Sequence, residues 1–557
     1  MTAILDTLAG ACEAVRRAGP GDAVAGVMPS CVAFPATVDE AAALMRAAAA
    51  HKLAVVPRGD GTRLGWGAPP DRCDLVVDTT RLDRIIEHAA GDLVVRVQAG
   101  VRIERLASVL GEAGQQLALD LPPGLDRSGP GAAYPRTPGL DRSGPGVAYP
   151  GTPGLDRSRP GEANLDRHGL DRSRPAGAGS GTPGPDRSRP EQADRREAAP
   201  GAPGCGTVGG VLATGVAGPR RLRYGTPRDL VIGITIVRAD GTVARSGGKV
   251  AKNVAGYDLG KLFAGSYGTL GLIAEAAFRL HPGPVASAYV TLETDDAGAS
   301  AAVAAALDSP LLPSAIEIDR PNPGGPVQVS VLLEGGDPPS AVAERASRLC
   351  DTLGQGAWSG GVAPPWWGRS AAAPADGTLI RIAFWAVALP AVLEAIDAAA
   401  LSAGLDPAVG GSAGAGVLYA AVDGGAEPGA VGEFAAALRR AIAGTAISPA
   451  TVRATRGGAP TTPTVLTWGD NPPAPPARDI TRGTTTPPHP APPTRDNPTG
   501  LARGGAPRGS VVVVSAPPRT RSAIDLWGPV PGIGLMRAVK DQFDPEHRMA
   551  PGRFAGF

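Results

Sequence analysis

The chain has 557 residues, of which 43% are hydrophobic and 19% are charged, so it is long enough for two or three domains that each bury a core. Its 54 basic and 53 acidic residues give a net charge of +1, which excludes the strongly positive surface of a nucleic-acid-binding protein. Five cysteines at long spacings exclude a zinc or iron–sulfur motif. We therefore expect a cytoplasmic protein without a resident metal. No run of about eighteen uninterrupted apolar residues predicts a membrane span, so any contact with the inner face of the cell membrane is expected through a partner.

The first part of the chain predicts alternating strands and helices. After an N-terminal helical segment, residues 1–27, the run 37–50 begins with an N-capping Thr followed three residues later by Glu, which predicts a helix. The short apolar runs 53–57 and 75–78 predict strands. The run 93–100 predicts a strand that leads into an amphipathic helix.

Two tracts interrupt this pattern. Residues 123–203 contain a repeat of fifteen residues, PGLDRSGPGAAYPRT followed by PGLDRSGPGVAYPGT. Each unit offers only one Leu and at most one Tyr to a core, so stacking of the units cannot offset the entropy of ordering them. We predict a disordered insert, with a specific binding role as the alternative. The Pro-rich tract 456–508 predicts a disordered linker for the same reason.

Three further segments complete the organisation. Two β-rich runs flank Asp240-Gly241, a strong hairpin signal, so the first domain, residues 28–282, combines parallel and antiparallel pairing in an α+β fold. Residues 283–455 hold strand-like runs separated by Ala-rich helices, which predicts a smaller α/β domain. Its candidate strands are 289–293, 327–334, 379–387 and 417–422. The segment 509–557 returns to the core with a strand and a short helix that ends at Asp544-Pro545.

Glycine-rich clusters in the first domain indicate a cofactor site. PRGDGTRLGWG, residues 57–67, follows a predicted strand, and its glycines let backbone N–H groups approach an anion. The cluster 206–233 places glycines among small residues, which leaves room for a flat ligand. The cluster 249–280 adds Asn253, Tyr257 and Asp258 as fixed polar groups. Each cluster alone is explained by an ordinary turn, whereas three in order favour a binding site.

These clusters resemble the FAD-binding domain shared by vanillyl-alcohol oxidase and p-cresol methylhydroxylase, and within that family the FAD-binding subunits of bacterial glycolate oxidases. The resemblance covers residues 28–282 without the insert and the closing stretch from Trp527. It implies a two-subdomain FAD-binding domain followed by a smaller cap domain, with two long disordered inserts. In the family an LDLPP-like segment runs directly into a GTVGG-like segment, so the insert lies beside the cofactor. The chain has Ala550 where relatives have Asn.

The resemblance also implies which residues bind FAD. The first cluster holds the pyrophosphate, the second lines the flavin and the ribityl chain, and the third meets the adenine end. In that order the implied residues are Arg58, Gly59, Asp60, Gly61 and Thr62; Thr207, Gly209, Gly210, Thr214, Gly215 and Gly218; and Gly271 and Ile273. Some relatives attach FAD through a His in the first loop, where this chain has Asp60 and Arg63, so we expect FAD to be bound non-covalently. Cys205 resembles a second attachment point of some relatives, with a small residue at the end of the insert as the other interpretation.

Catalytic residues are not assigned by the sequence. Oxidation of a 2-hydroxy acid needs a base, a cation for the carboxylate and a flavin, yet residues 283–455 contain no His. Arg381 is a candidate for the carboxylate, although an Arg on a strand is often salt-bridged. His281 and His547 are expected to pack or cap, and Tyr257 and Asp258 to hold their loop.

Three functions remain open. The first is the FAD-binding subunit of a glycolate oxidase complex, which the resemblance implies has a larger flavoprotein subunit and an iron–sulfur subunit as partners. The second is a stand-alone FAD-dependent alcohol or hydroxy-acid oxidoreductase. The third is a structural subunit that has lost its flavin.

Overall fold

The computed structural model describes residues 2–120, 206–248, 258–369, 376–444 and 509–556. These residues belong to one compact unit of the chain, 1–135 and 203–557. The predicted insert 123–203, the predicted linker 456–508, and Cys205, Asn253 and Tyr257 lie outside the described residues.

The first sheet has four strands in the order β1-β2-β4-β3. Strands β2, β4 and β3 are parallel, and β1 pairs antiparallel with β2. As predicted, Thr37 caps the helix α2, because its Oγ1 accepts the N–H of Glu40 at 3.1 Å. The elements are α1 (Thr2–Ala11), β1 (Val15–Arg17), β2 (Cys31–Ala33), α2 (Val38–Ala50), β3 (Val55–Arg58) and β4 (Leu75–Asp78).

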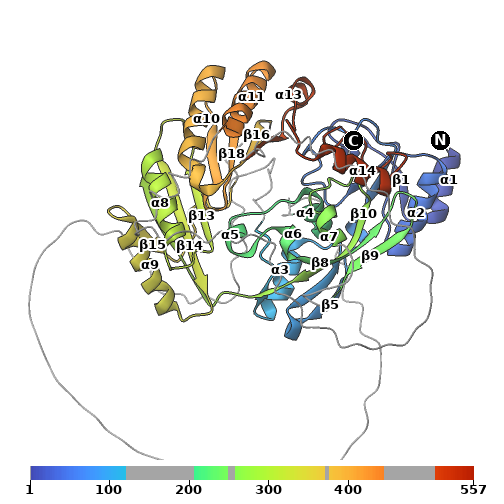
Figure 1. The fold of residues 1–557 in the computed structure, drawn as a ribbon. Coiled ribbons are helices and arrows are strands. Elements are labelled where there is room, and N and C mark those ends of the chain that lie inside the picture. The colour runs from blue at the N-terminus through green and yellow to red at the C-terminus, as the bar shows by residue number, and fades with distance from the viewer. Residues whose placement is uncertain (1, 121–205, 249–257, 370–375, 445–508, 557) are drawn as a thin grey trace, which may run out of the picture. The chain divides into compact units, whose positions relative to one another are not determined.

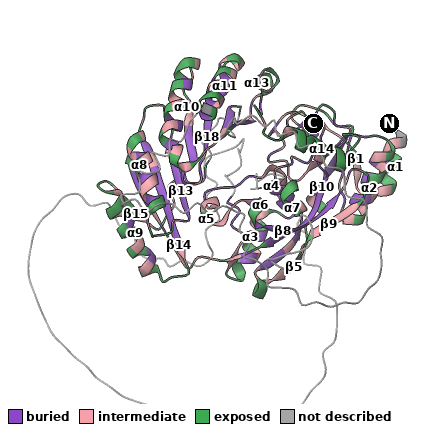
Figure 2. Cartoon of the chain, in the orientation of Figure 1, coloured by how far each residue is buried: buried purple, intermediate pink, exposed green. Residues whose placement is uncertain are grey.

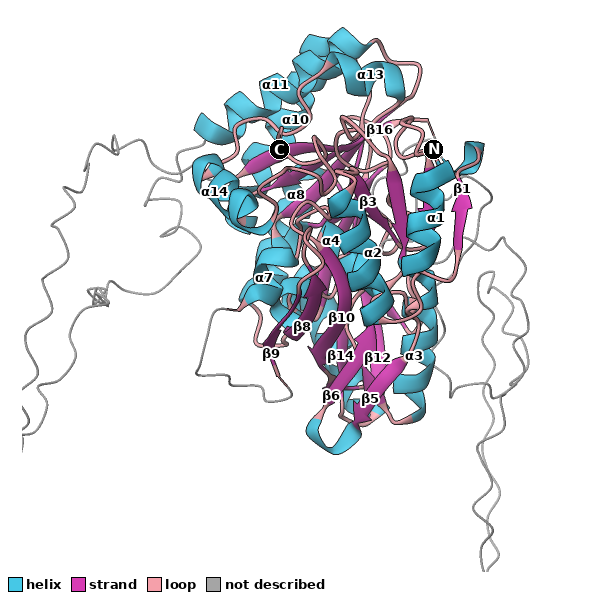
Figure 3. Cartoon of the chain, turned by 90° about the vertical axis from the view of Figure 1, so that its right-hand side faces the viewer, coloured by secondary structure: helices cyan, strands magenta, loops and turns pink. Residues whose placement is uncertain are grey.

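The second sheet has five antiparallel strands in the order β5-β6-β10-β8-β9, drawn together in Figure 3. The turn at Asp240-Gly241 joins β8 to β9, which confirms the predicted hairpin. One apolar core lies between this sheet and helices α3 and α4. The strands are β5 (Ile85–Ala89), β6 (Val94–Gln98), β8 (Val231–Val237), β9 (Val243–Gly247) and β10 (Leu272–Arg279), and the helices are α3 (Ile103–Glu112), α4 (Val208–Thr214), α5 (Arg221–Tyr224), α6 (Pro227–Leu230) and α7 (Leu259–Phe263). A short pair, β7 (Gln115–Gln116) and β11 (His281–Pro282), lies beside them.

The second domain is built on an eight-stranded sheet in the order β15-β12-β14-β13-β17-β18-β16-β19. Every pairing in it is antiparallel, so the prediction of an α/β domain is wrong in its pairing, and this domain is α+β. Strand and helix patterns alternate along the chain, but the helices return each strand antiparallel to its neighbours. Its strands are β12 (Ala286–Thr294), β13 (Ala315–Arg320), β14 (Val327–Gly335), β15 (Trp358–Gly360), β16 (Thr378–Ala383), β17 (Ala408–Ser412), β18 (Val417–Val422) and β19 (Ser510–Ser515).

Four helices cover one face of this sheet (Figure 1). They are α8 (Asp296–Asp308), α9 (Pro339–Leu353), α10 (Leu389–Ala403) and α11 (Pro428–Gly444). Figure 2 shows buried strands beneath helices whose outer sides are exposed. The segment 386–403, which includes α10, is the one helix in the described ranges that is long and apolar enough to cross a membrane. Its residues Val392, Leu393 and Ile396 are buried in the core against the sheet.

The C-terminal segment contacts both domains. Strand β19 pairs with β16 in the second domain, and α14 (Ile533–Phe543) packs its residue Phe543 against Phe263 of α7 in the first. A short helix, α13 (Pro518–Ala523), lies between them in the chain. Helix α14 ends at Phe543 with Asp544 as its C-cap, which agrees with the predicted stop at Asp544-Pro545. The segment therefore joins the sheet of one domain to the helices of the other.

A fully buried lysine fastens this segment to the first domain. The Lys540 Nζ donates to the carbonyl of Thr269 at 2.7 Å, to the carbonyl of Met549 at 3.0 Å and to the Asp544 carboxylate at 2.5 Å. Both charged side chains are fully buried. Removal of one partner of such a pair leaves an uncompensated buried charge.

We expect Lys540→Met to lower the free energy of unfolding by about 3–5 kcal/mol. The matched control is Lys261→Met, because the pair Lys261–Asp258 is about half exposed and such pairs contribute about 0–1 kcal/mol. Urea unfolding followed by circular dichroism measures both variants. Equal losses in the two variants would contradict the anchoring role of Lys540.

Candidate functional site

The first domain contains a cleft where three separate segments meet. It opens to solvent, and the space between its walls, part of which is open solvent, amounts to about 730 Å³. Most of its lining residues come from the loop after β3, from α4 and its N-terminus, and from the segment that leads into β10. They are Pro57, Arg58, Gly59, Asp60, Gly61, Thr62, Arg63, Leu64, Thr79, Thr207, Gly209, Gly210, Ala213, Thr214, Tyr267, Gly268, Gly271, Leu272, Ile273 and Arg553.

The loop after β3 forms one wall. Gly59 contacts the N-terminus of α4 so closely that a Cβ on it would lie 2.1 Å from the Thr207 Oγ1. Gly61 has a φ of +82°, a conformation that other residues rarely adopt. Between them, the Asp60 Oδ1 accepts a hydrogen bond from the Thr62 hydroxyl at 3.1 Å. The Asp60 Oδ2 is buried and has no hydrogen-bond partner among the described groups.

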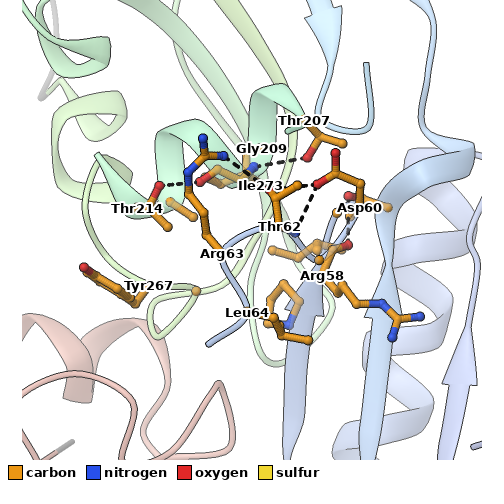
Figure 4. A pocket seen from close by; sticks show the side chains of 18 of the residues that line it. Arg58, Asp60, Thr62, Arg63, Leu64, Thr207, Gly209, Thr214, Tyr267 and Ile273 are labelled. Atoms are coloured by element: carbon orange, nitrogen blue, oxygen red, sulfur yellow. Dashed lines mark hydrogen bonds between the residues drawn. The ribbon is translucent and has the colours of Figure 1, made fainter. Parts of the chain in front are cut away.

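The two arginines of this loop point in different directions (Figure 4). The Arg58 side chain lies away from Thr62, Thr207 and Thr214, and its guanidinium binds Asp22 and Asp78. The Arg63 side chain is buried; its Nη1 donates to the Thr62 Oγ1 at 3.3 Å, and its guanidinium lies 5.7 Å from the centre of the Trp66 ring. Of the two arginines in this loop, Arg63 therefore brings its positive charge to the cleft, whereas Arg58 contributes its backbone.

Helix α4 forms the second wall. Its N-cap is Thr207, whose Oγ1 accepts the N–H of Gly210 at 3.4 Å. Gly209 lies against the residue that follows β6, because a Cβ on it would come within 2.8 Å of the Ala99 Cβ. The Thr214 hydroxyl, at the last turn, donates to the carbonyl of Gly210 at 2.8 Å. The helix thus exposes small residues along its cleft side.

The third wall runs from Tyr267 to Ile273. Tyr267 has a φ of +54° and packs against two aromatic rings of the C-terminal segment, Trp527 with centroids 5.3 Å apart and Phe554 at 5.9 Å. Burial raises the pKa of Tyr267. Gly271 approaches β8 closely, because a Cβ on it would lie 2.9 Å from the Val237 carbonyl oxygen.

Arg553 fastens the first wall from the C-terminal segment. It is 4% exposed and donates to the carbonyls of Leu64 at 3.0 Å and Trp66 at 2.7 Å. Burial lowers the pKa of Arg553 to about 10, so it remains a cation at neutral pH. The loop after β3 is therefore held by a residue from the far end of the chain.

The structure brings most of the predicted binding residues together. Gly215 and Gly218 are the exceptions, because they do not line the cleft. Gly215 ends α4 with a φ of +64°, and a Cβ on Gly218 would lie 2.0 Å from the Asp120 carbonyl oxygen. These two glycines are explained by backbone packing. That the remaining residues bind FAD stays a prediction.

Several lining residues were missed by the sequence argument. Arg63, Tyr267 and Gly268 lie inside the glycine-rich clusters, which gave a usable signal, and Arg553 lies in the closing motif. Thr79 follows a strand and has no local pattern that marks it. None of the described histidines, His51, His88, His281 and His547, lines the cleft, and the described residues contain no group of metal-ligating side chains.

The face of the eight-stranded sheet that lacks helices holds polar side chains. Arg381 on β16 lies opposite Tyr419 on β18, and both lie close enough to Tyr267 of the cleft to affect its pKa. The next strands contain Glu317 on β13, which is 3% exposed. Burial raises the pKa of Glu317 to about 8, and its Oε1 has no hydrogen-bond partner in the described part of the chain.

The cleft residues fit an extended ligand such as FAD. A Cβ on Gly61 would have only the Arg58 Cδ within 4 Å, and one on Gly210 only the Thr207 Oγ1, at 3.4 Å, so both glycines leave open space that a ligand can fill. The adjacent Arg63 cation suits a pyrophosphate. The unpartnered Asp60 Oδ2 can accept a hydrogen bond from a hydroxyl group.

Sequence comparison finds relatives of the domain that contains this cleft. A family model described as an FAD binding domain matches residues 29–133 and 163–247. The chain is 27% identical over 296 residues to the glycolate oxidase subunit GlcD of Bacillus subtilis, covering 53% of this chain and 46% of that protein. It is 51% identical over 81 residues to the glycolate oxidase subunit GlcE of Escherichia coli, covering 14% of this chain and 23% of that protein. The matches thus span about half, or less, of these relatives.

Solved structures agree on the fold. An alkyldihydroxyacetonephosphate synthase superposes with a TM-score of 0.52 at 14% identity, covering 94% of this chain and 76% of that chain. A chitooligosaccharide oxidase superposes with a TM-score of 0.52 at 13% identity, covering 98% and 97%. The chain therefore contains an FAD-binding domain, and its cofactor is FAD.

Proposed function

We propose that this chain is the FAD-binding subunit of an oxidoreductase complex that oxidises a 2-hydroxy acid, with glycolate as the first substrate to test. The observation that supports this most is the 51% identity to the GlcE subunit over 81 residues, together with the similarity to the GlcD subunit. In this proposal the partners are a larger flavoprotein subunit and an iron–sulfur subunit. The complex acts in the cytoplasm, and its partners make any contact with the inner face of the cell membrane.

The residues of the cleft have separate tasks in this proposal. When bound, FAD supplies the acceptor for two electrons. The loop 59–62 and Arg63 bind the pyrophosphate, Arg553 holds that loop in place, and the small residues of α4 give the flavin room. Tyr267 lies where the cleft approaches the second domain. FAD is held non-covalently, and electrons leave through the partner subunits.

The first experiment is an absorbance spectrum of the chain purified alone, before and after acid precipitation, followed by anaerobic addition of glycolate. The proposal expects a yellow protein that releases its colour in acid and is not bleached by glycolate until the partner subunits are added. Bleaching of the chain alone would favour the second candidate below. A colourless protein that takes up no added FAD would leave a flavin-less structural subunit.

A second candidate function is oxidation of the hydroxy acid by this chain itself. The observation that favours it is Arg381, whose side chain has no hydrogen bond or ion pair with any other described residue although it is only partly exposed. It lies beside Tyr419 and near Tyr267 of the cleft. An arginine without a partner carboxylate can bind the carboxylate of a substrate through two parallel hydrogen bonds.

We expect Arg381→Gln to raise the glycolate concentration needed for half-maximal bleaching by about tenfold to a hundredfold, because a hydrogen bond to a charged group contributes about 1.5–3 kcal/mol. The measurement uses whichever preparation glycolate bleaches, the chain alone or the complex. The FAD content and the rate of reduction at saturating glycolate serve as controls. The FAD content should not change. An unchanged half-maximal concentration would remove Arg381 from the substrate site.

A further inference from the structure

A buried ion cluster lies where β3 enters the cofactor cleft. Arg58 is the last residue of β3, and its Nε donates to the Asp78 Oδ2 at 2.8 Å while its Nη1 donates to the Asp22 Oδ1 at 3.1 Å. The three side chains are 11%, 6% and 7% exposed, in the order Arg58, Asp78 and Asp22. Asp78 ends the neighbouring parallel strand in register with Arg58. The guanidinium is therefore enclosed by two carboxylates on the side away from the cleft.

Asp22 comes from a segment outside the FAD-binding family match, which begins at residue 29. Its carboxylate accepts two hydrogen bonds from Arg16, at 2.6 and 2.8 Å, and one from the N–H of Gly19 at 2.8 Å. The hydrogen bonds from Arg16 hold the pKa of Asp22 well below its usual range. Asp22 is thus an oriented anion before it contacts Arg58.

The same cluster fixes the backbone that leads into the cleft. The Thr79 hydroxyl donates to the carbonyl of Arg58 at 3.1 Å, and the Asp78 Oδ1 accepts the N–H and the hydroxyl of Thr80. Both the side chain and the carbonyl of Arg58 are therefore held by other segments of the chain. The residues that follow it, Gly59 to Thr62, line the cleft, so their placement depends on where β3 ends.

We propose that Asp22 is a positioning residue for FAD, which holds the Arg58 side chain outside the cleft so that the loop 59–62 meets the pyrophosphate with its backbone. Released from Asp22, the guanidinium loses one of its two carboxylates, and the end of β3 loses a tie to the segment 15–22. The loop then has to be ordered when the cofactor binds, which weakens binding. The inference rests on FAD binding and is independent of the substrate.

The test measures the release of FAD from the purified holoprotein, as the rise of flavin fluorescence after dilution. Asp22→Asn is expected to speed release by about tenfold to a hundredfold, since it weakens a hydrogen bond between charged groups. The matched control is Asp83→Asn, because the pair Asp83–Arg105 is more than half exposed on the same domain and its loss should leave the rate unchanged.

A double-mutant cycle separates positioning from general support of the fold. If Asp22 acts through Arg58, then Asp22→Asn has no further effect on FAD release in an Arg58→Met background. If Asp22 only stabilises its own turn with Arg16, the two effects add, and the proposal is overturned. Melting temperatures of all four proteins are recorded beside the release rates, and a release rate that merely follows the melting temperature also overturns it.

The outcomes distinguish this inference from the assignment of the cofactor. A wild-type chain that holds no FAD overturns both. A wild-type chain that holds FAD, with Asp22→Asn releasing it at the wild-type rate or more slowly, overturns only the role of Asp22. Slower release would mean that the freed Arg58 side chain binds the phosphates itself.

Discussion

Replacing Gly59 by alanine is expected to cost the protein most of its FAD. The added Cβ would lie 2.1 Å from the Thr207 Oγ1 and 3.2 Å from both other side-chain carbons of that residue, so the loop and the N-terminus of α4 have to separate. Both line the cleft. Overpacking of this kind costs about 1–3 kcal/mol, which corresponds to a roughly tenfold to hundredfold weaker binding of FAD if the cost falls on the cleft. The ratio of flavin absorbance to protein absorbance after gel filtration measures the loss.

Gly65→Ala is the matched control for this variant. Gly65 belongs to the same glycine-rich loop, but the nearest atom to its added Cβ is the Arg521 Nη2 at 3.7 Å, an ordinary van der Waals contact. This variant should keep its FAD. If Gly59→Ala and Gly65→Ala retain equal amounts of FAD, then the closeness of Gly59 to Thr207 does not shape the cofactor site.

Glu317→Gln is expected to make the protein more stable at alkaline pH. The pKa of Glu317 is raised to about 8, chiefly by burial, from an ordinary value of 4.5. Between these two values the unfolded chain releases the proton while the folded chain keeps it, so the free energy of unfolding falls as the pH rises. The full loss is at most about 5 kcal/mol, because one pKa unit corresponds to about 1.4 kcal/mol. The glutamine cannot ionise, so its variant escapes this loss.

The measurement is the melting temperature of both proteins from pH 5 to pH 9. The curve of the wild type should fall away from that of Glu317→Gln as the pH rises and should run parallel to it above about pH 8. Glu293→Gln is the control, because Glu293 lies exposed on β12 of the same sheet and its replacement should leave the profile unchanged. Parallel curves for the wild type and Glu317→Gln over the whole range would show that Glu317 is ionised in the folded protein.

Local signals predicted the elements of the fold well. The N-cap at Thr37 and the turn at Asp240-Gly241 depend on neighbouring residues only, and both are found in the structure. The direction of strand pairing in the second domain depends on which strands meet, and the spacing of helices and strands does not determine it. The sequence does not predict strand β13, with the sequence AIEIDR, because its charged residues hide the alternation of Ile316 and Ile318, which are buried.

The sequence predicts most glycines of the candidate site, but it does not predict where the charged side chains of the site lie. Glycines that allow close approach are visible in the sequence, since their clusters are local. The direction of the Arg58 side chain is set by Asp22 and Asp78, and Asp22 lies 36 residues away in the chain. No local pattern marks such a pair. The sequence therefore assigned Arg58 to the pyrophosphate, whereas its guanidinium lies outside the cleft.

The fastening of the cofactor loop by Arg553 has a consequence for the biosynthesis of the protein. Arg553 follows Leu64, its hydrogen-bond partner, by 489 residues, and the whole second domain lies between them in the chain. While the ribosome is still making that domain, the loop after β3 lacks its final support. Domains that are continuous in the chain can mature as they emerge. The first domain cannot, because the C-terminal segment that supports its loop is made last. We therefore expect nascent chains that stop before Arg553 to bind FAD weakly, so that the flavin is acquired late in synthesis.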